Sequence, residues 1–318
     1  MFLIAGEALI DMVPTRDGAY LPVAGGAPYN FARALALQGL PATYANPLSE
    51  DAFGTLLEQG LTAAGVQYAG RKSNRPTSLA FVSTDEHGHP HYSFYRQGVA
   101  DRDVDAEALI ALDSEQVSGF HTGGLALVPP DDRCVLAAAH HFRRRGVLCT
   151  ADINMRPQVA ASLGIAQTHY RDAAVEVIGS ADIVKVSDED LHHLGYMEAP
   201  EIAASSLLER GPKIVVLTLG SAGAWAISAD DQVFEPAQKV TVVDTVGAGD
   251  SFFAGFIASL DGQGQLTAAR HRAPPGSALK RALLRAAVCA AINIGRPGCQ
   301  PPTREEAERW LAIHPQKP

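Results

Sequence analysis

The residues best suited to chemistry lie in the stretch DTVGAGDSFFAGF, which runs from position 244 to position 256. Apolar residues recur there at helical spacing: Phe252, Phe253, Phe256, Ile257 and Leu260. The overlapping tract KVTVVDTV is rich in β-branched residues, so the sequence predicts a strand, a turn at GAGD and then a helix. The first amides of a helix lack internal hydrogen-bond partners and carry partial positive charge. We therefore expect an anion site at this turn.

Asp250 places a carboxylate at the same helix start. Gly247 and Gly249 carry no side chain that would keep a phosphate away from the backbone amides. An acidic group beside a bound anion is unfavourable unless it has a chemical role, and the alternative is an ordinary helix N-cap. Two other motifs are excluded: GxGxxG would need glycine where Phe252 stands, and the chain has no GxxxxGK(S/T) phosphate loop.

The elements that must position these residues alternate between extended apolar runs and helical patterns. Buried strands are predicted at FLIAGEALIDMV, VSGFHTGGLAL, VLCTADIN, ADIVKVS and KIVVLTLG. Tracts such as NFARALALQG and CVLAAAHHFRRRG are helical patterns between them. This alternation predicts an α/β fold, a three-layer, mostly parallel sheet with helices on both faces. The break at 262–276 is short, so a single domain over 1–318 is expected.

A β-hairpin pattern interrupts the alternation at TSLAFVSTDEHGHPHYSFYR, where two strand-like tracts flank a polar DEHGH turn. Together with the tract after the first strand, it predicts a small sheet built from about residues 12–24 and 76–97. A projecting sheet beside a cleft is a candidate lid. His87, His89 and His91 would share one strand face, but no fourth metal ligand is evident, so an ordinary polar turn is the preferred interpretation.

Composition and charge exclude several classes of protein. The 318 residues are 47% hydrophobic, enough for a large core, and the net charge of −9 does not suit a nucleic-acid surface. The basic run at 143–145 closes a helical pattern before Gly146, as cations at a helix end do. Four cysteines without a CxxC pair favour a reducing compartment. With neither a signal-peptide pattern nor about 18 consecutive apolar residues, the sequence predicts a cytoplasmic protein without nucleic-acid or membrane partners.

Two tracts far apart in the chain resemble the signatures of a known family. DTVGAGDSFFAGF resembles the C-terminal signature of the ribokinase-like (PfkB) family of carbohydrate kinases. GGAPYNFARALALQGL, at 25–40, resembles the N-terminal signature. Their order and spacing agree with the family along nearly the full chain. The resemblance implies an ATP-dependent kinase acting on a sugar hydroxyl, with a parallel α/β core and a small β lid.

The resemblance also implies roles for individual residues. Asp250 matches the catalytic base, and the amides of Gly247, Ala248 and Gly249 match the anion hole. These roles agree with phosphoryl transfer, whose loose transition state needs an oriented nucleophile and neutralised charge more than a strong base. The sugar-binding positions, which include Asp250 again, match Asp11, Gly25, Gly26, Asn30, Phe94, Arg96 and Arg156. A tight turn is the alternative for the glycine pair, and a capped carbonyl or a surface ion pair is the alternative for Arg156.

For the nucleotide, TLGSAGAW resembles the ATP loop of the family, with a simple hairpin turn as the alternative. The implied ATP contacts are Lys185, Ser187, Thr218, Gly220, Gly223, Gly249 and Asn293. Where the family often has Asn-x-x-Glu, tied to Mg²⁺ and phosphate, this chain has Ser187 and Asp190. Asp190 is therefore a metal candidate, directly or through water, and Mg²⁺ is expected with ATP. The resemblance also implies a monovalent cation, K⁺, near Asp244.

The substrate follows from smaller patterns. FYRQGVAD, with Phe94 and Arg96, and DINMRP, with Arg156, resemble fructokinases and the related 2-keto-3-deoxygluconate kinases, and the first pattern is more similar to fructokinases. A non-catalytic sugar sensor with a kinase fold is an alternative, although the intact GAGD set speaks against it. A Rossmann oxidoreductase fails on the missing fingerprint. An exposed apolar side of the hairpin would favour a homodimer.

Overall fold

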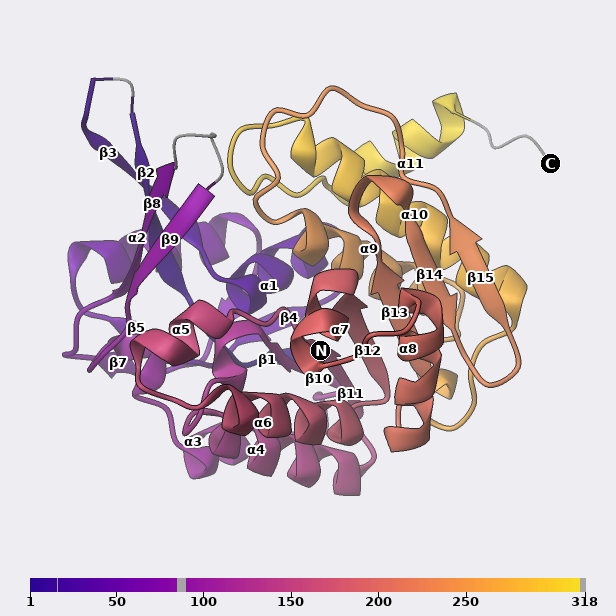
Figure 1. Ribbon diagram of the computed structural model, residues 1–318, viewed down its shortest axis with the longest axis horizontal. Helices are drawn as coiled ribbons and strands as arrows, with labels where there is room; N and C mark the ends of the chain where they lie inside the picture. The colour runs from indigo at the N-terminus through magenta and orange to yellow at the C-terminus, as the bar shows by residue number, and fades with distance from the viewer. Residues whose placement is uncertain (16, 85–89, 315–318) are drawn as a thin grey trace.

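A nine-stranded sheet runs through the middle of the molecule (Figure 1). The computed structural model describes residues 1–15, 17–84 and 90–314. From edge to edge the strands are β15 (Gln232–Glu235), β14 (Ala224–Ile227), β13 (Ile214–Thr218), β12 (Ile183–Ser187), β11 (Leu148–Asp152), β10 (Gly119–Gly123), β1 (Phe2–Ile4), β4 (Ala42–Tyr44) and β6 (Gln67–Tyr68). Neighbours from β13 to β6 are parallel, while β14 and β15 pair antiparallel. The predicted α/β class is confirmed.

Each face of this sheet has its own apolar core. Successive residues of a strand point to opposite faces. In β12, Val184 and Val186 belong to one core cluster and Ile183 to the other. In β1, Leu3 and Ile4 divide in the same way. Because both faces are covered, the strands have the nearly continuous apolar sequences from which they were predicted.

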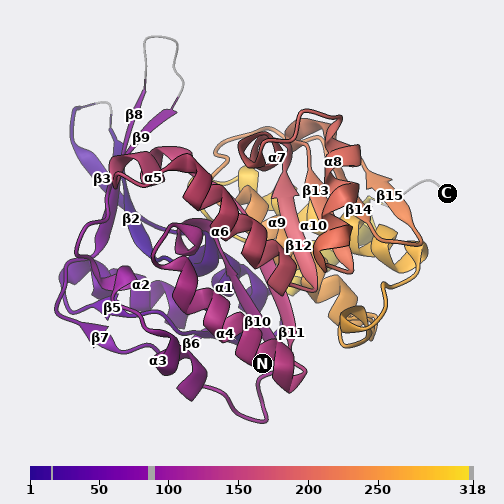
Figure 2. The same ribbon diagram turned by 60° about the horizontal axis from the view of Figure 1, so that its bottom comes forward.

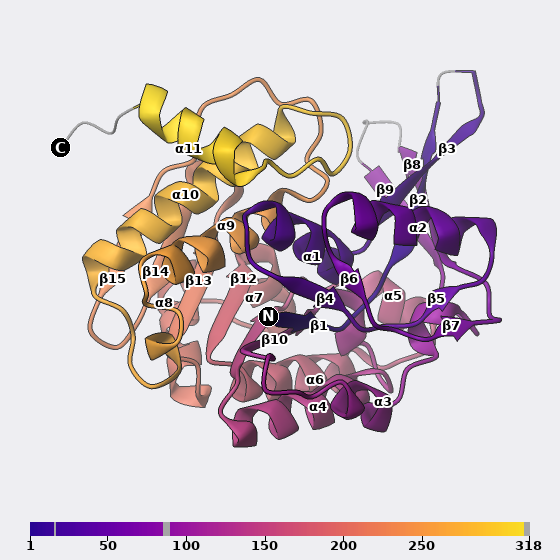
Figure 3. The same cartoon turned by 180° about the vertical axis from the view of Figure 1, so that it is seen from behind.

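Helices cover both faces of the sheet. The face seen in Figure 1 carries α3 (Ala106–Ala111), α4 (Asp132–Arg145), α5 (Pro157–Ser162), α6 (Gln167–Ser180), α7 (Asp188–Leu194) and α8 (Pro200–Ser206). The opposite face, seen in Figure 3, carries α1 (Ala27–Leu37), α2 (Ala52–Ala63), α9 (Ala248–Gly262) and α10 (Gly276–Ile294), and α11 (Arg304–Ile313) packs against α10. As predicted, the basic run ends α4, and Gly146 follows it in the left-handed conformation that caps a helix.

A four-stranded sheet projects from one end of the large sheet (Figures 1 and 2). Its order is β3 (Tyr20–Gly25), β2 (Leu9–Pro14), β8 (Ser78–Thr84) and β9 (Pro90–Tyr95). β2 is parallel to β8, and the other pairs are antiparallel. The predicted DEHGH turn, with His87 and His89, lies outside the described residues. A separate ladder joins β5 (Leu48–Ser49) to β7 (Lys72–Ser73).

Two strand predictions are wrong in detail. FLIAGEALIDMV forms two strands, since the chain leaves the large sheet at Ala5 and enters the small one at Leu9. KVTVVDTV forms no strand, and Val242 and Val243 are exposed. The backbone amides of Val243 and Asp244 donate instead to the carbonyl of Ile294. β-Branched residues favour a strand only where a neighbouring strand is available to pair with them, and here α10 takes that place.

The helices and the cysteines have two further features. Among the described residues, no helix combines the length and the apolar character that a membrane span requires. All four cysteines, Cys134, Cys149, Cys289 and Cys299, are free thiols.

Candidate active site

A cleft of about 390 Å³ opens at the carboxyl ends of the parallel strands. From β1 the chain first adds β4 and β6 on one side and then β10 on the other, so the strand order reverses between β1 and β10. Ligands of open α/β sheets bind at such a switch point. The strands and the segments that follow them supply much of the lining: Glu7, Gly124, Leu125, Asn154, Arg156, Lys185, Ser187, Glu189, Asp190 and Thr218. The segment 245–250, the start of α1 and the small sheet complete it.

Asp250 lies in the first turn of α9 and meets α1. Asn30 Nδ2 donates a hydrogen bond of 3.0 Å to Asp250 Oδ2, which joins residues 220 positions apart in the chain. Burial, with the charge of Asp152, raises the pKa of Asp250 to about 7, although Asn30 and Lys185 oppose the rise. Asn30 Oδ1 is buried and has no hydrogen-bond partner in the described structure. This amide therefore offers a free acceptor beside a carboxyl group that titrates near neutrality.

Gly247, Ala248 and Gly249 form the start of α9 and line the cleft beside Asp250. Gly247 has a φ of +72°, and a Cβ there would lie 2.2 Å from Cys299 Sγ, so this position requires glycine. A Cβ on Gly249 would lie 3.1 Å from Lys185 Nζ. Because neither glycine has a side chain, these two residues place no atoms beyond the backbone between the first amides of α9 and the ammonium group of Lys185. This arrangement fits an anion such as a phosphate group.

Lys185 forms a buried ion pair beneath this turn. Its Nζ lies 2.9 Å from both carboxylate oxygens of Asp152, and the two side chains are 6% and 5% exposed. Burial lowers the pKa of Lys185, but the charge and hydrogen bonds of Asp152 outweigh that effect and raise it. Lys185 is therefore a fixed cation in the floor of the cleft. The charge of this cation also acts on Asp250.

Asp190 holds the chain around it together. Its Oδ1 accepts from the Met155 amide at 2.7 Å, and its Oδ2 accepts from the Ser187 amide and hydroxyl at 2.8 and 2.9 Å. Both carboxylate oxygens of Asp190 therefore already accept hydrogen bonds from the chain, and its metal contact, direct or through water, stays a prediction. Within the described ranges, no group of three or more His, Cys, Asp and Glu side chains is arranged to hold a metal ion.

The end of the cleft next to the small sheet is acidic. Burial raises the pKa of Glu7 to about 7 against the opposing charge of Arg96. Burial, with the charge of Asp244, raises the pKa of Asp11 to about 7 as well. With Asp250, three carboxyl groups of similar pKa therefore line this end.

The glycine pair fits the turn between β3 and α1 against these acids. A Cβ on Gly25 would lie 2.3 Å from Asp11 Oδ2, and Gly26, with a φ of +107°, leaves no room for one beside the Glu7 carbonyl. The backbone at Gly25 and Gly26 therefore forms the tight turn that was the alternative to a sugar-binding role. Gly26 also lines the cleft, whereas Gly25 does not.

Arg156 and Phe94 both line the cleft, as predicted positions of the sugar site. Arg156 Nη1 also donates to the Met155 carbonyl at 2.8 Å, so the carbonyl-capping alternative holds alongside the cleft position. Phe94 comes from β9 of the small sheet.

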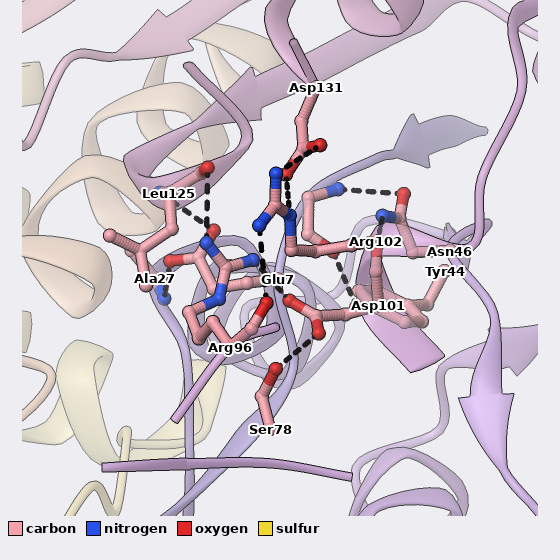
Figure 4. Close-up of polar contacts among 11 residues, drawn as sticks. Glu7, Ala27, Tyr44, Asn46, Ser78, Arg96, Asp101, Arg102, Leu125 and Asp131 are labelled. Atoms are coloured by element: carbon pink, nitrogen blue, oxygen red, sulfur yellow. Dashed lines mark hydrogen bonds and ion pairs between the residues drawn. The ribbon is translucent and has the colours of Figure 1, made fainter. Parts of the chain in front are cut away.

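Arg96 requires a correction, because it does not line the cleft. Its side chain is 2% exposed and forms an ion pair with Asp101, which is 1% exposed (Figure 4). Arg96 Nη1 also donates to the Leu125 carbonyl at 3.5 Å. The FYR pattern correctly placed Phe94 at the cleft, but Arg96 lies two residues beyond it, where β9 has ended and the chain turns into the core.

Three predicted nucleotide residues do not line the cleft either. Gly220 and Gly223, with φ values of +54° and +129°, form the turn between β13 and β14. This agrees with the simple hairpin turn that was the alternative to an ATP loop. Asn293 is fully buried and donates to the Val246 carbonyl at 2.8 Å. Asn293 therefore holds the turn before α9 in place from α10. Lys185, Ser187, Thr218 and Gly249 do line the cleft.

Asp244 supports the same turn. Its Oδ1 accepts from the Val246 amide at 3.0 Å, and its Oδ2 accepts from the Gly298 amide at 2.8 Å. Asp244 does not line the cleft. The K⁺ site near it stays a prediction.

Sequence reasoning missed Glu7, Asn154 and the partner of Lys185, Asp152. Each lies at or just after the carboxyl end of an observed strand, where a parallel sheet places its functional groups: Glu7 follows β1, Asp152 ends β11 and Asn154 follows it. Glu7 was hidden because a single strand was predicted over FLIAGEALIDMV. Asn154 carries a further signal that only the structure shows, a φ of +39°. Such a conformation is uncommon for a residue other than glycine and is enriched in asparagine.

Comparison with known proteins adds three findings. The sequence profile of the family described as pfkB family carbohydrate kinase matches residues 4–306. A fructokinase of Rhizobium leguminosarum bv. trifolii is 35% identical over 272 residues, which cover 84% of this chain and 82% of the relative. The solved fructokinase of Xylella fastidiosa with bound ATP superposes with a TM-score of 0.87 at 26% identity, covering 98% of both chains. Fructokinase from Vibrio cholerae O395 in its fructose, ADP and calcium ion bound form gives a TM-score of 0.80 at 25% identity, covering 93% of both chains.

We expect Asp250→Asn to stabilise the protein without ligands at pH 8. The folded-state pKa of Asp250, about 7, lies above the ordinary 3.8, so this carboxyl favours folding at low pH and loses that contribution as the pH rises through 7. Removing the buried charge should raise the free energy of unfolding at pH 8 by up to roughly 4 kcal/mol, and by less at pH 5. Urea unfolding at both pH values measures this.

Asp261→Asn is the matched control, because Asp261 is exposed at the other end of α9. Its stability should equal that of the wild type at both pH values. An Asp250→Asn variant that is no more stable than the wild type at pH 8 would contradict the buried, near-neutral titration of Asp250.

Proposed function

The chain belongs to the pfkB family of carbohydrate kinases, and on this basis we propose that it is a fructokinase, which transfers the γ-phosphoryl group of ATP to a hydroxyl of fructose. The observation that carries the proposal is the position of Asp250. Its buried carboxyl group, bound to Asn30, lies in the cleft beside the first amides of α9 and the cation Lys185. A proton acceptor and an anion site therefore share one wall of the cleft.

In this proposal Asp250 accepts the proton of the attacking sugar hydroxyl. A carboxylate with a pKa near the working pH is well matched to that task, and such a base contributes about 10² to 10⁴-fold to the rate. Asn30 orients Asp250 through Nδ2, and its unpaired Oδ1 suits a second hydroxyl of the sugar. The two groups together would hold the nucleophile in line with the phosphoryl group.

The first amides of α9 and the cation Lys185 would stabilise the transferring phosphoryl group. The amides of Gly247, Ala248 and Gly249 would donate hydrogen bonds to it, that of Ala248 in exchange for its 3.2 Å bond to the Thr245 carbonyl. Lys185 supplies a full positive charge that Asp152 holds in place. Donors fixed before the reaction stabilise developing charge without reorganising, an effect worth about 3 kcal/mol per donor in comparable sites. Ser187 and Thr218 line the cleft nearby and would hold the outer phosphates of ATP.

The metal ions are proposed on chemical grounds. Mg²⁺ neutralises ATP phosphates and keeps much of its water shell, so contact with the protein through water at Asp190 suits it. K⁺ near Asp244, a cytoplasmic location and a homodimer stay predictions of the same proposal.

The charge of the cleft supports a neutral sugar. Glu7, Asp11 and Asp250 gather at the sugar end, and a substrate carboxylate there would be repelled whenever these groups are ionised. Neutral hydroxyls, in contrast, donate hydrogen bonds to carboxylates. Arg156 is the observation that favours the second candidate, 2-keto-3-deoxygluconate, because a guanidinium group pairs well with a carboxylate. A sugar sensor would need none of the phosphate-end residues.

The substrate test is ADP release with MgATP and fructose, glucose, mannose, ribose or 2-keto-3-deoxygluconate. We expect fructose to be preferred and Asp250→Asn to lower kcat about 10² to 10⁴-fold, since the mutant keeps the shape of the site but loses the base. Preference for the keto-acid would move the substrate to the second candidate. Sugar binding without turnover would favour the sensor.

The pH dependence follows from the raised pKa of Asp250. The base is protonated below its pKa of about 7, so kcat/KM for the sugar should fall below neutrality, whereas an ordinary aspartate would act down to about pH 4. Initial rates from pH 5 to 9 measure this. A profile that stays flat to pH 5 contradicts Asp250 as the base.

Gly249→Ala tests the anion site. The added Cβ would lie 3.1 Å from Lys185 Nζ and occupy the space beside the amides, so we expect kcat/KM for ATP to fall about 10²-fold. Alanine is favoured over glycine in a helix by about 0.5–1 kcal/mol, which offsets part of the cost of displacing Lys185 Nζ, and a thermal melt checks that the variant is folded. Gly262→Ala, at the open end of α9, is the control and should keep full activity. Unchanged ATP kinetics in Gly249→Ala would refute the site.

A further inference from the structure

The small sheet is joined to the body of the protein at four places, and one buried cluster contacts all of them. The chain enters β2 after Glu7, leaves β3 at Gly25 into Ala27 of α1, enters β8 at Ser78 and leaves β9 before Arg96. We name Glu7, Ser78, Arg96 and Asp101 the anchor cluster. Each of these four residues is at most 4% exposed.

Each connection has its own bond to this cluster (Figure 4). Glu7 Oε1 accepts from the Ala27 amide at 3.0 Å, which ties the start of β2 to the end of β3. Asp101 accepts from the Ser78 hydroxyl at the start of β8 and from the Arg96 guanidinium just after β9. Both strands of the predicted hairpin are therefore held by one carboxylate.

Arg96 connects the two halves of the cluster. The charges of Asp101 and of Glu7 both act on it, and its Nη1 donates to the Leu125 carbonyl, while Glu7 Oε2 accepts from the Leu125 amide at 3.0 Å. Arg102 Nη1 donates to the Arg96 carbonyl at 3.2 Å and so fixes its backbone. Without the arginine, two buried acids would remain with no cation between them.

The cluster also reaches the sugar end of the cleft. Glu7 lines the cleft itself. Asp11 follows it by four residues in β2, and Phe94 precedes Arg96 by two residues in β9; both are cleft residues carried by the small sheet. The phosphate end, with Lys185 and Gly249, is built from the large sheet and α9 and has no bond to the cluster in the described structure.

We propose that Arg96 is a positioning residue that fixes the small sheet, and with it Asp11 and Phe94, at the sugar end of the cleft without touching either substrate. This inference rests on the proposed kinase function. It replaces the direct sugar contact first predicted for Arg96, which its burial between Asp101 and Glu7 does not allow. It also predicts that a change at Arg96 weakens binding of the sugar and leaves binding of ATP unchanged.

The test is Arg96→Met, which keeps the length and apolar stem of the side chain but removes the charge. We expect KM for the sugar to rise at least about tenfold, whereas the Kd of ATP measured by calorimetry without sugar should stay within about twofold of the wild type. Arg96→Lys should recover part of the sugar affinity, because an ammonium group can pair with Asp101 but cannot also reach the Leu125 carbonyl in the same geometry.

Lys280→Met is the matched control for lost stability. Lys280 Nζ lies 2.7 Å from the carboxylate of Glu235, which is 2% exposed, so the variant also leaves a buried acid without its cation, but at the far edge of the large sheet. It should melt at a lower temperature with KM for the sugar unchanged. Asp101→Asn is the second test variant should Arg96→Met not fold, and it should raise KM for the sugar in the same direction.

The outcomes separate the two proposals. If the wild type phosphorylates no sugar, the proposed function fails. If the wild type is active and Arg96→Met or Asp101→Asn lowers only the melting temperature, or weakens ATP and sugar equally, the positioning role is wrong. A selective rise of KM for the sugar, partly reversed in Arg96→Lys and absent in Lys280→Met, supports it.

Discussion

The packing of α1 against α9 is the contact on which the rest of the site depends. Phe31 of α1 and Phe253 of α9 lie with ring centroids 5.6 Å apart, and the ring of His121 from β10 stacks on Phe31 at 3.7 Å. Burial, with the charge of Lys185, lowers the pKa of His121 to about 3, so this ring stays neutral in the core. Asn30 precedes one phenylalanine and Asp250 lies one turn before the other. Their hydrogen bond therefore follows from apolar packing directly beneath it.

The second constraint is the cost of placing carboxyl groups in a closed cleft. Glu7, Asp11 and Asp250 all have a pKa raised to about 7, chiefly by burial. Burying an ionised group is unfavourable unless it is paired. The charge of Arg96 acts on Glu7 and that of Lys185 on Asp250, but neither outweighs the effect of burial. Such destabilised groups persist where function needs them, since a bound sugar would satisfy them with its hydroxyls. The site is thus a source of instability in the free protein.

The two ends of the cleft come from different parts of the chain. The N-terminal third supplies Glu7, Asp11, Asn30 and Phe94, the groups that suit a sugar, and the small sheet that holds two of them. The later parts supply Lys185, Thr218 and the start of α9, the groups that suit phosphates. Asp250 belongs to the second set by sequence and to the first by contact. The reaction center of a phosphoryl transfer has to be at such a junction, because the nucleophile and the phosphoryl group must meet in line.

Local patterns were sufficient for much of this protein. The parallel sheet, the hairpin strands, the helix behind GAGD and the glycines of both signatures were predicted, because side-chain periodicity and backbone conformation are properties of neighbouring residues. Roles that depend on partners far away in the chain were not. The burial of Arg96 by Asp101 and Glu7, the pairing of Lys185 with Asp152 and the supporting place of Asn293 under Val246 needed the folded chain. KVTVVDTV has the composition of a strand, yet only the tertiary structure decides whether a neighbouring strand is there to pair with it.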